Sequence, residues 1–566
     1  GAAVSTLTDL NPRQRHEALA VLEGNDFDVL VIGGGVVGAG VALDAASRGL
    51  RVALIEARDY ASGTSSRSTK LFHGGLRYLE QFQFSLVWEA LHERTLMVET
   101  LAPHLTRPIE ILYPLRRAVD RPYVGMGVGV YDVMGARKGV PRSHRHIGRT
   151  AARALFPSGN PDAVKGGVLF HEAQVDDARH TLALVRTAAD SGAIVVNSVR
   201  AEHLLRDGDR VVGARVADIE SGHAFDIHAS ATITAVGVWT QELIGSDIDL
   251  GFALKASKGV HITVPRERID CATALISRTE RSVLFVIPWG EVWVIGTTDT
   301  PWEGSRAHPS ATSADIDYLL DEVNSLLSVP VTRADIVGVY VGLRPLIDDG
   351  GETNRASREH AVAAPVPGLV AVAGGKYTTY RVMAQEAVDA CVPSLSSEPA
   401  PSATESLPLV GSRGYASLPL WRDVLKERIG VDDAALDRLI RRYGTEVHTL
   451  ADYIEVNPSL AEPVAAGYLK AEIHHSVIAE GALHLDDVLA RRTRLSIETP
   501  DRGVLCARPV AEIMAGPLGW TAAQLDAEVD AWVRRVEAEV ASQQQATDVE
   551  SDRVRNADPD SRNLAS

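Results

Sequence analysis

The sequence predicts an α/β fold that joins a parallel-sheet unit to an antiparallel sheet and to a C-terminal region of helices. The parallel unit is indicated by two short buried strands, 28–32 and 52–55, with a helical segment between them. The antiparallel sheet is indicated by apolar runs that flank Asp207-Gly208 and Gly290-Glu291, because turns of this kind join hairpin strands. From 416 to about 541 the apolar residues recur with helical spacing.

The first strand ends in a G-x-G-x-x-G turn formed by Gly33, Gly35 and Gly38. In a Rossmann-like dinucleotide site these glycines allow the tight turn, the approach of a pyrophosphate, and the packing of helix on strand. The helix N-terminus then offers unpaired N–H groups to the diphosphate. Glu56 ends the second strand, where an acid can bond a ribose hydroxyl. A glycine-rich packing turn is the alternative, but strand, helix and acid together favour a dinucleotide site.

Length, charge and cysteine content narrow the class of protein. A chain of 566 residues is expected to form two or three domains. The net charge of −17 disfavours a nucleic-acid partner. Three widely spaced cysteines form no disulfide framework, which favours a reducing compartment such as the cytoplasm. No apolar run approaches the roughly 20 residues of a spanning helix, so we expect a protein that is soluble or peripherally attached to a membrane.

The dinucleotide is predicted to be FAD. A nicotinamide enzyme would usually continue with alternating helices and parallel strands, whereas here the sheet becomes antiparallel. A second fingerprint is missing, because Gly125, Gly127 and Gly129 lack the strand and helix that such a motif needs. One fingerprint with the flavin end bound elsewhere fits FAD better.

The predicted domains interleave along the chain. We expect an FAD-binding domain in three segments, a substrate-binding sheet, a helical domain after a Pro/Ser-rich linker at 393–408, and a disordered polar tail. The expected bounds are 26–95, 161–240 and 336–395 for the FAD-binding segments, 96–160 for a substrate- and membrane-facing segment, 241–335 for the antiparallel-sheet substrate domain, 409–541 for the helical domain and 542–566 for the tail.

Several long motifs resemble those of one enzyme family. Residues 62–80, SGTSSRSTKLFHGGLRYLE, closely resemble the second signature of FAD-dependent, quinone-linked glycerol-3-phosphate dehydrogenases. Further similar motifs follow in order: VDDAR at 175–179, KGVH at 258–261, FVIPW at 285–289, IGTTDT at 295–300, GLRPL at 342–346, SREH at 357–360, GGKYTTYR at 374–381 and LDDVLARRTR at 485–494. The chain departs from the family at TAVGVW, 234–239, and at His171-Glu172.

The resemblance implies oxidation of sn-glycerol 3-phosphate to dihydroxyacetone phosphate by hydride transfer to FAD, with a membrane quinone as electron acceptor. A soluble oxidase that uses oxygen is the alternative within the family, and a flavin-bound sensor without turnover is an alternative outside it. A phosphate dianion needs several cations, preferably planar guanidinium groups. By resemblance, the substrate is bound by Arg77, Tyr78, Arg344, Arg358 and Lys376.

The catalytic residues are predicted to be His261 and Arg344. A histidine can accept the hydroxyl proton near neutral pH, and Arg344 could hold the C2 oxygen. His261 could instead be a hydrogen-bonded structural residue of a sheet. His73 competes for the role of base, although it is expected to lie against the flavin.

Other residues are expected around the cofactor. Gly374-Gly375-Lys376 fails the P-loop pattern, since Tyr377 follows the lysine, and is interpreted as a strand-to-helix turn facing the flavin. Besides the fingerprint glycines and Glu56, the predicted cofactor contacts are Thr64, Ser65, Ser66, Lys70, His73, Gly237, Gly375, Thr378 and Thr379. We expect no metal, because adjacent His474 and His475 point apart on a helix.

A basic segment at 116–153 indicates contact with anionic lipid. It holds nine Arg or Lys residues against two Asp, with apolar residues between them. A solvated basic loop or a rim that steers anions is the alternative interpretation. We therefore expect a cytoplasmic enzyme, peripheral at the inner face of the cell membrane. A homodimer remains open from the sequence.

Overall fold

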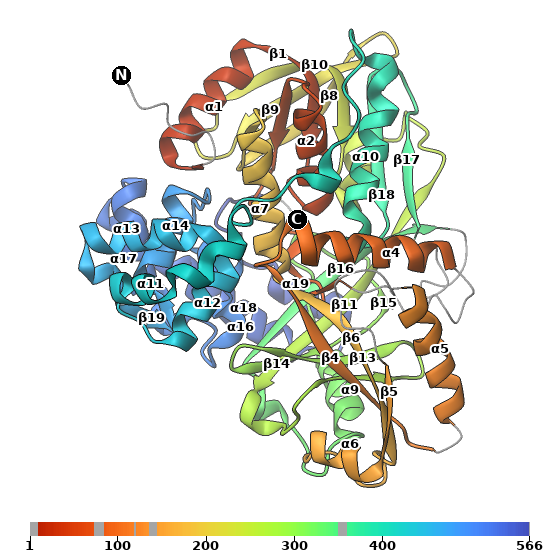
Figure 1. Cartoon of the computed structure of the whole chain (residues 1–566). Helices are drawn as coiled ribbons and strands as arrows, with labels where there is room; N and C mark the ends of the chain where they lie inside the picture. Colours follow the sequence, from red (N-terminus) through yellow and green to blue (C-terminus); the bar gives the residue numbers. More distant parts are fainter. Residues whose placement is uncertain (1–8, 73–83, 118–119, 135–143, 349–358, 565–566) are drawn as a thin grey trace.

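The computed structural model describes residues 9–72, 84–117, 120–134, 144–348 and 359–564 (Figure 1). Two large sheets and a helical region organise them. Figure 1 shows the helical region on one side of the molecule, with helices α4 (Phe84–Leu96) and α5 (Asp120–Met134) on the opposite side.

The first sheet has a parallel centre, as the sequence predicts. Strand β1 pairs in parallel with β2 and β10, and β10 pairs in parallel with β18. Its path is β17 (His360–Ala363), β18 (Leu369–Gly374), β10 (Ala224–Thr234), β1 (Asp26–Ile32), β2 (Val52–Ile55) and β7 (Ile194–Val196). The predicted hairpin around Asp207-Gly208 is confirmed as β8 (Val199–Asp207) and β9 (Arg210–Asp218), and β9 pairs with β10.

Both faces of this sheet are covered, which explains why β1 and β2 are almost wholly apolar. Helices α2 (Val36–Ser47), α7 (Asp177–Asp190) and α10 (Tyr380–Cys391) share one hydrophobic core with Val29, Val31 and Leu54. The other face packs Leu30 and other residues against α1 (Pro12–Gly24) and the β8–β9 hairpin.

The second sheet is mostly antiparallel, as the sequence predicts. Its path is β15 (Thr300–Pro301), β11 (Ala253–Pro265), β14 (Val292–Gly296), β13 (Val283–Trp289), β12 (Ala274–Arg278), β4 (Thr106–Pro114), β6 (Gly166–Val175) and β3 (Leu71–Phe72), with β16 (Gly338–Asp348) on β11 and β5 (Arg145–Gly148) on β6. The predicted hairpin around Gly290-Glu291 is confirmed as β13 and β14. Helices α9 (Ser313–Asn324) and α6 (Arg149–Leu155) together pack on one face of this sheet.

Three strands pair in a different sheet from the one that the sequence suggested. Strands β3, β6 and β16 belong to the second sheet, although the sequence placed them in segments of the FAD-binding domain. The physical reason is that an apolar strand pairs equally well in either sheet by its own pattern. Its sheet is decided by distant partners, such as β11 for β16.

The C-terminal region is helical, with one small exception. Its helices are α11 (Arg422–Ile429), α12 (Asp433–Tyr443), α13 (Val447–Val456), α14 (Lys470–Ile478), α15 (Leu485–Asp487), α16 (Leu495–Glu498), α17 (Val504–Leu518), α18 (Ala522–Ser542) and α19 (Asp548–Arg555). A two-stranded sheet, β19 (Pro463–Ala465) and β20 (Tyr468–Leu469), interrupts them.

The tail expected to be disordered is ordered through residue 564. After α19 the chain returns to the parallel-sheet unit, where Arg562 donates two hydrogen bonds of 2.8 Å to the carboxylate of Asp487 and another to Ser198. Asp560 accepts one hydrogen bond from Arg58 at 3.3 Å, and its Oδ2 lies 3.0 Å from Nε2 of His308. Polar composition suggested disorder, but these ion pairs with distant residues fix the segment.

Candidate active site

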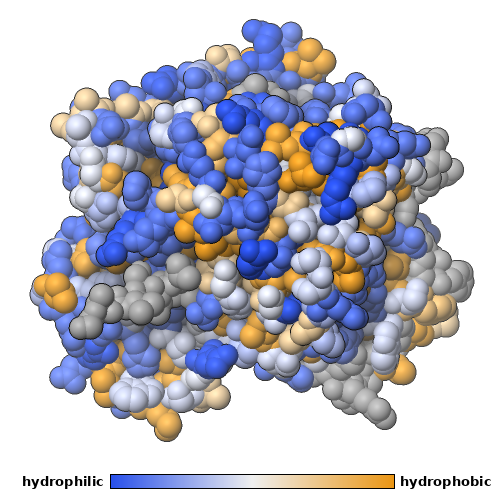
Figure 2. Space-filling view, turned by 90° about the horizontal axis from the view of Figure 1, so that it is seen from above, coloured by the Kyte–Doolittle hydropathy of each residue, from blue (hydrophilic) through white to orange (hydrophobic). Residues whose placement is uncertain are grey.

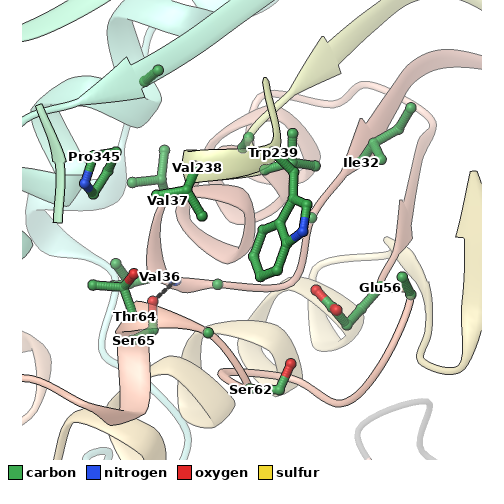
Figure 3. A pocket seen from close by; sticks show the side chains of 18 of the residues that line it. Ile32, Val36, Val37, Glu56, Ser62, Thr64, Ser65, Val238, Trp239 and Pro345 are labelled. Carbon is green, nitrogen blue, oxygen red and sulfur yellow. Dashed lines mark hydrogen bonds between the residues drawn. The ribbon is translucent and has the colours of Figure 1, made fainter. Parts of the chain in front are cut away.

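A cavity of about 420 Å³ opens at the carboxyl ends of β1, β2 and β18 (Figure 3). Ligands in open α/β sheets bind in this position, where the loops that follow the strands converge. The walls come from the glycine turn, from the 3-10 helices η1 (Thr64–Ser66) and η3 (Gly237–Trp239), from β8, and from the turn after β18. Leu564 of the ordered tail also lines it.

The glycine turn is shaped as a dinucleotide fingerprint requires. Gly33 has φ +117°, and a Cβ there would collide with the carbonyl of Ala235. A Cβ on Gly38 would collide with the carbonyl of Gly33, so helix and strand pack closely only with glycine. Gly35 is different, since a Cβ would meet only Ser65 Oγ at 3.1 Å and would otherwise enter the cavity.

Backbone N–H groups and one carboxylate define the phosphate and ribose end. Val36, the first residue of α2, donates its N–H to Ser65 Oγ at 2.8 Å, as the dashed line in Figure 3 shows. Glu56 accepts from the N–H groups of Gly34 at 2.7 Å and Arg58 at 2.9 Å. These bonds fix its carboxylate at the cavity, and the indole of Trp239 faces the same space (Figure 3).

The opposite end of the cavity is closed by the turn after β18. Gly374 and Gly375 have φ of +74° and +77°, which non-glycine residues rarely adopt. Lys376 precedes the short helix η6 (Tyr377–Thr379) and lines the cavity. Thr64 donates its hydroxyl to the carbonyl of Leu343 at 2.5 Å, which ties η1 to β16.

Strands β11 and β16 place His261 and Arg344 on one face of the second sheet. In their antiparallel register, His261 is opposite Tyr340 and Ser257 is opposite Arg344. Val260 and Ile262 belong to the core under α9, so the alternation of side chains puts His261 on the other face. Gly259 lies between them, and a Cβ there would be 3.0 Å from Arg344 Nη2.

His261 is enclosed and neutral. Its Nε2 is 2.9 Å from Thr69 Oγ1, and its ring stacks on Tyr340 with 4.7 Å between centroids. Burial lowers the pKa of His261 well below its usual value, and the charges of Arg344 and Lys70 add to this effect. The imidazole is therefore uncharged at neutral pH, and a ring nitrogen can accept a proton.

Arg344 is held by the segment that follows β14. Its Nη1 donates to the carbonyl of Thr298 at 3.3 Å, and its Nη2 donates to Thr297 Oγ1 at 3.2 Å. Asp299 Oδ1 lies 3.7 Å from Nη1. The IGTTDT and GLRPL segments therefore converge on one guanidinium group.

Comparisons with known proteins agree with this geometry. Residues 28–381 match the family described as FAD dependent oxidoreductase, and residues 402–525 match the C-terminal domain of alpha-glycerophosphate oxidase. Glycerol-3-phosphate dehydrogenase 2 of Mycobacterium tuberculosis is 52% identical over 558 residues, which cover 98% of this chain and 95% of that protein. The human mitochondrial glycerol-3-phosphate dehydrogenase is 34% identical, with 91% of this chain and 74% of that protein covered.

This chain belongs to the FAD-dependent glycerol-3-phosphate dehydrogenase family. The solved structure of the Bacillus halodurans glycerol-3-phosphate dehydrogenase with FAD is 28% identical, with a TM-score of 0.78 over 95% of this chain and 100% of that one. The L-alpha-glycerophosphate oxidase of Mycoplasma pneumoniae, 18% identical with a TM-score of 0.54 over 68% of this chain and 99% of that one, is alike in fold alone.

FAD is the cofactor of this family, and the residues present fit it. The cavity side of Gly35 leaves room for a pyrophosphate, the N-terminus of α2 points toward the same space, and Glu56 is fixed beside it. The family thus explains the cavity of about 420 Å³ as the place where FAD fits.

The structure brings together most of the predicted cofactor residues. Those that line the cavity are Gly33, Gly35, Glu56, Thr64, Ser65, Gly237 and Gly375. Gly38, Ser66, Thr378 and Thr379 lie behind this wall rather than in it. His73, Arg77, Tyr78 and Arg358 lie outside the described residues, so their predicted roles stay predictions.

Lys70 was predicted to contact the cofactor, but it does not line the cavity. It is 1% exposed, and its ammonium group lies 3.0 Å from Asp177 Oδ1 and 4.9 Å from the centre of the Tyr340 ring. Burial lowers its pKa to about 8, and Arg494 adds to the effect. Lys70 therefore anchors the VDDAR segment through Asp177.

Sequence reasoning missed several residues of the site. Trp239 was visible only as part of the atypical TAVGVW motif. Thr69 and Tyr340, which hold His261, lie in recognised segments but carry no catalytic signal of their own. Leu564 had no signal at all, because only the three-dimensional course of the tail brings it to the cavity.

Proposed function

We propose that this enzyme oxidises sn-glycerol 3-phosphate to dihydroxyacetone phosphate and passes the electrons to a membrane quinone. The observation that carries the proposal is the pairing of a neutral, buried His261 with Arg344 on one sheet face beside the cofactor cavity. The names of the similar dehydrogenases support the same substrate. FAD, when bound, supplies the acceptor for the hydride that leaves C2 of the substrate.

His261 would accept the proton of the substrate hydroxyl. A buried neutral imidazole gains a proton most readily when its partner oxygen develops negative charge nearby. Thr69 fixes the ring at Nε2, and stacking on Tyr340 prevents its rotation out of plane. Arg344 would stabilise the C2 oxygen as it loses its proton, since its guanidinium group lies over Gly259, two residues from His261.

Arg344 and Lys376 would also provide positive charge for the substrate phosphate. Both come from family motifs, and Lys376 lines the cavity at its flavin end. Arg77, Tyr78 and Arg358 are proposed as further phosphate contacts by resemblance. A dianion shared by several charge-assisted donors is held strongly, and glycerol without its phosphate should be a poor substrate.

The decisive experiment is anaerobic mixing of the FAD-loaded enzyme with glycerol 3-phosphate. We expect the flavin absorbance to bleach in wild type and in His228→Gln, a control in which an exposed histidine of β10 is replaced. Bleaching should be much slower in His261→Gln. If wild type does not bleach with glycerol 3-phosphate, or bleaches equally with glycerol, the proposed substrate is wrong.

A surface on α4 and α5 supports the membrane acceptor. Phe84 and Trp88 are 47% and 53% exposed on α4, while Met126 and Val133 are 67% and 74% exposed on α5. The spacing within each helix puts these side chains on one face, and both helices lie on the same side in Figure 1. The face seen in Figure 2 mixes hydrophilic residues with several apolar patches.

Basic residues precede and follow α5 in the chain. Arg116, Arg117, Arg145 and Arg149 are exposed in the same part of the chain. Apolar side chains with nearby cations are suited to the interface of an anionic bilayer. No helix in the described ranges is long and apolar enough to cross a bilayer, so we propose peripheral attachment at the inner face of the cell membrane.

An oxidase that uses oxygen is the second candidate. Measuring hydrogen peroxide against quinone reduction in the same preparation separates the two. We expect quinone reduction to dominate on vesicles, and stoichiometric hydrogen peroxide would favour the oxidase.

A further inference from the structure

A second cavity, of about 70 Å³, lies where the helical region meets the second sheet. Its volume is roughly five times what one ordered water molecule needs. The walls come from the edge strand β16, the segment before α9, the turn at Ser66-Arg67, and helices α18 and α19. The turn at 64–68 separates it from the FAD cavity, because Ser65 and Ser68 line the FAD cavity whereas Ser66 and Arg67 line this one.

Guanidinium groups dominate this cavity. Five arginines line it, Arg67, Arg491, Arg494, Arg535 and Arg555, and Glu539 is the only carboxylate in the lining among the residues that the structure describes. Two of the five are neutralised elsewhere. Arg491 pairs with Asp59 and Asp487, and Arg494 pairs with Asp176 and Asp177.

The other three arginines have too few carboxylates. Arg535 and Arg555 share Glu539, whose Oε1 is 3.0 Å from one and 3.5 Å from the other, and Arg535 also contacts Asp486. The hydrogen bonds of Arg67 go to the backbone carbonyls of Ala307 at 3.2 Å and Val341 at 3.4 Å. Positive charge therefore exceeds negative charge in an enclosed space.

A neighbouring arginine adds to the excess. Arg502 donates to Gln543, which lines the cavity, at 3.0 Å. Its Nη1 is buried without a hydrogen-bond partner within the described part of the chain, and the same holds for Nε of Arg494. Unpartnered buried donors next to a polar cavity point to an acceptor from solution.

The electrostatics agree with this geometry. Burial lowers the pKa of Arg67 to about 9, and repulsion by Arg535, Arg491 and Arg555 adds to the shift. Burial likewise lowers the pKa of Arg555 to about 10, although Glu539 opposes it. Guanidinium groups do not deprotonate in proteins at neutral pH, so a bound anion would offset the repulsion among these charges.

We propose that this cavity is an anion-binding site for a tetrahedral oxyanion of phosphate type, held by Arg67, Arg535 and Arg555. Planar guanidinium groups bind such oxyanions through paired hydrogen bonds. The anion fastens α18 and α19 to the 66–70 segment. That segment also carries Thr69, the hydrogen-bond partner of His261, so the site joins the helical region to the catalytic face.

The site is tested by thermal unfolding of the FAD-loaded enzyme in inorganic phosphate, with chloride balancing the ionic strength. We expect the wild-type midpoint to rise and to follow a saturable curve, because a ligand that binds the folded state stabilises it. Arg67→Gln and Arg555→Gln should each weaken phosphate binding about tenfold or more. Arg553→Gln is the matched control, since Arg553 is on α19 with its side chain 70% exposed.

Phosphate also stabilises proteins without binding a site, by exclusion from their surface. That general effect is the same in all variants and does not saturate. An equal rise in wild type, Arg67→Gln and Arg555→Gln overturns the proposal. In chloride alone, Arg67→Gln should be at least as stable as wild type, because one repelling charge is removed. Competitive inhibition of turnover by phosphate should persist in Arg67→Gln, which separates this site from the substrate pocket.

Crystals of the wild-type holoenzyme soaked in selenate provide a test that does not depend on variants. An anomalous peak between Arg67, Arg535 and Arg555 is expected, and its absence overturns the proposal. The source of the oxyanion is distinguished with Arg344→Gln, in which substrate binding is weakened. An Arg67-dependent rise at lower concentrations of glycerol 3-phosphate than of inorganic phosphate identifies a phosphorylated metabolite, and the reverse order identifies free phosphate.

Discussion

The two cavities on either side of the 64–68 turn are built from different chemistry. The phosphate end of the FAD cavity is made of backbone N–H groups, a hydroxyl and glycines, from Gly33 to Val36 and Ser65. The second cavity is made of arginine side chains from four separate segments. Backbone dipoles bind an anion without burying a formal charge, whereas gathered guanidinium groups are costly until an anion joins them.

The largest expected effect is at the glycine turn. Gly35→Val should abolish FAD binding, because its side chain would occupy the side of the turn that faces the cavity. Flavin absorbance per protein measures the loss. Gly24→Val is the control, since a Cβ at Gly24 meets nothing within 4 Å. If Gly35→Val kept its full FAD content, or if Arg67→Gln lost FAD, the distinction between the FAD cavity and the arginine-lined cavity would be wrong.

His261 gives the next largest effect. His261→Gln should slow flavin bleaching by about 10²–10⁴-fold while FAD stays bound, as expected for loss of a general base. Burial lowers the pKa of His261 well below its usual value of 6.5. The wild-type bleaching rate should therefore stay level as pH falls to 6.5 and should decline only at a lower pH. If the variant bleaches at the wild-type rate, His261 is not the general base, and His73 or a water held by Arg344 becomes the candidate.

Arg344 comes third. Arg344→Ala should cost about 2–5 kcal/mol in kcat/KM, since a buried anionic substrate loses a charge-assisted partner. Steady-state kinetics with a dye acceptor measures this cost. Arg508→Ala, which removes a half-exposed arginine of α17, should leave kcat/KM unchanged. Equal values for the two variants would exclude Arg344 from the substrate site.

The protein should lose stability gradually in acid, because two buried histidines pack on or beside α7. Burial lowers the pKa values of His104 and His180 to about 3, so these residues stay neutral when folded but take up protons below pH 6.5 when unfolded. Their contribution to stability is therefore complete above pH 6.5 and declines as pH falls toward 3. The slope is about 1.4 kcal/mol per pH unit for each histidine. Urea unfolding at pH 7 and pH 5 measures it, and a higher stability at pH 5 would contradict the assignment.

The smallest effect is expected at the membrane surface. Arg145→Glu or Arg149→Glu should weaken binding to anionic vesicles by about 1 kcal/mol for each removed positive charge. Cosedimentation at low and at physiological ionic strength measures the change, because salt screens exposed charges. Glu267→Lys, on a different segment, is the control. If vesicle binding changes neither in the charge-reversed variants nor with ionic strength, the anion-steering interpretation of 116–153 is favoured.

The two cavities also differ in how far the sequence could predict them, because one is built from neighbouring residues and the other from distant ones. Gly33, Gly35, Gly38 and Glu56 lie within one βαβ unit, so their spacing alone predicts the cofactor turn. The Asp207-Gly208 and Gly290-Glu291 hairpins were predicted for the same local reason. His261 and Arg344 could be predicted only through a family resemblance, because they lie on strands that are distant in sequence and whose register pairs His261 with Tyr340.

Non-local features could not be predicted. The sheet to which β6 and β16 belong depends on partners far along the chain. Residues 542–566 have the composition of a disordered tail, yet Arg562 donates hydrogen bonds to Asp487 and Ser198. The cluster of Arg67, Arg535 and Arg555 has no pattern in sequence, since each residue belongs to a different element.

The return of the tail to the FAD cavity has a consequence for how the cofactor is retained. Leu564 contributes to the cavity wall, and the nearby Arg562 is held by Asp487 and Ser198. Cleavage of the chain after α19 would remove this part of the wall while the glycine turn stayed intact. Limited proteolysis of that segment should therefore be detected as free flavin.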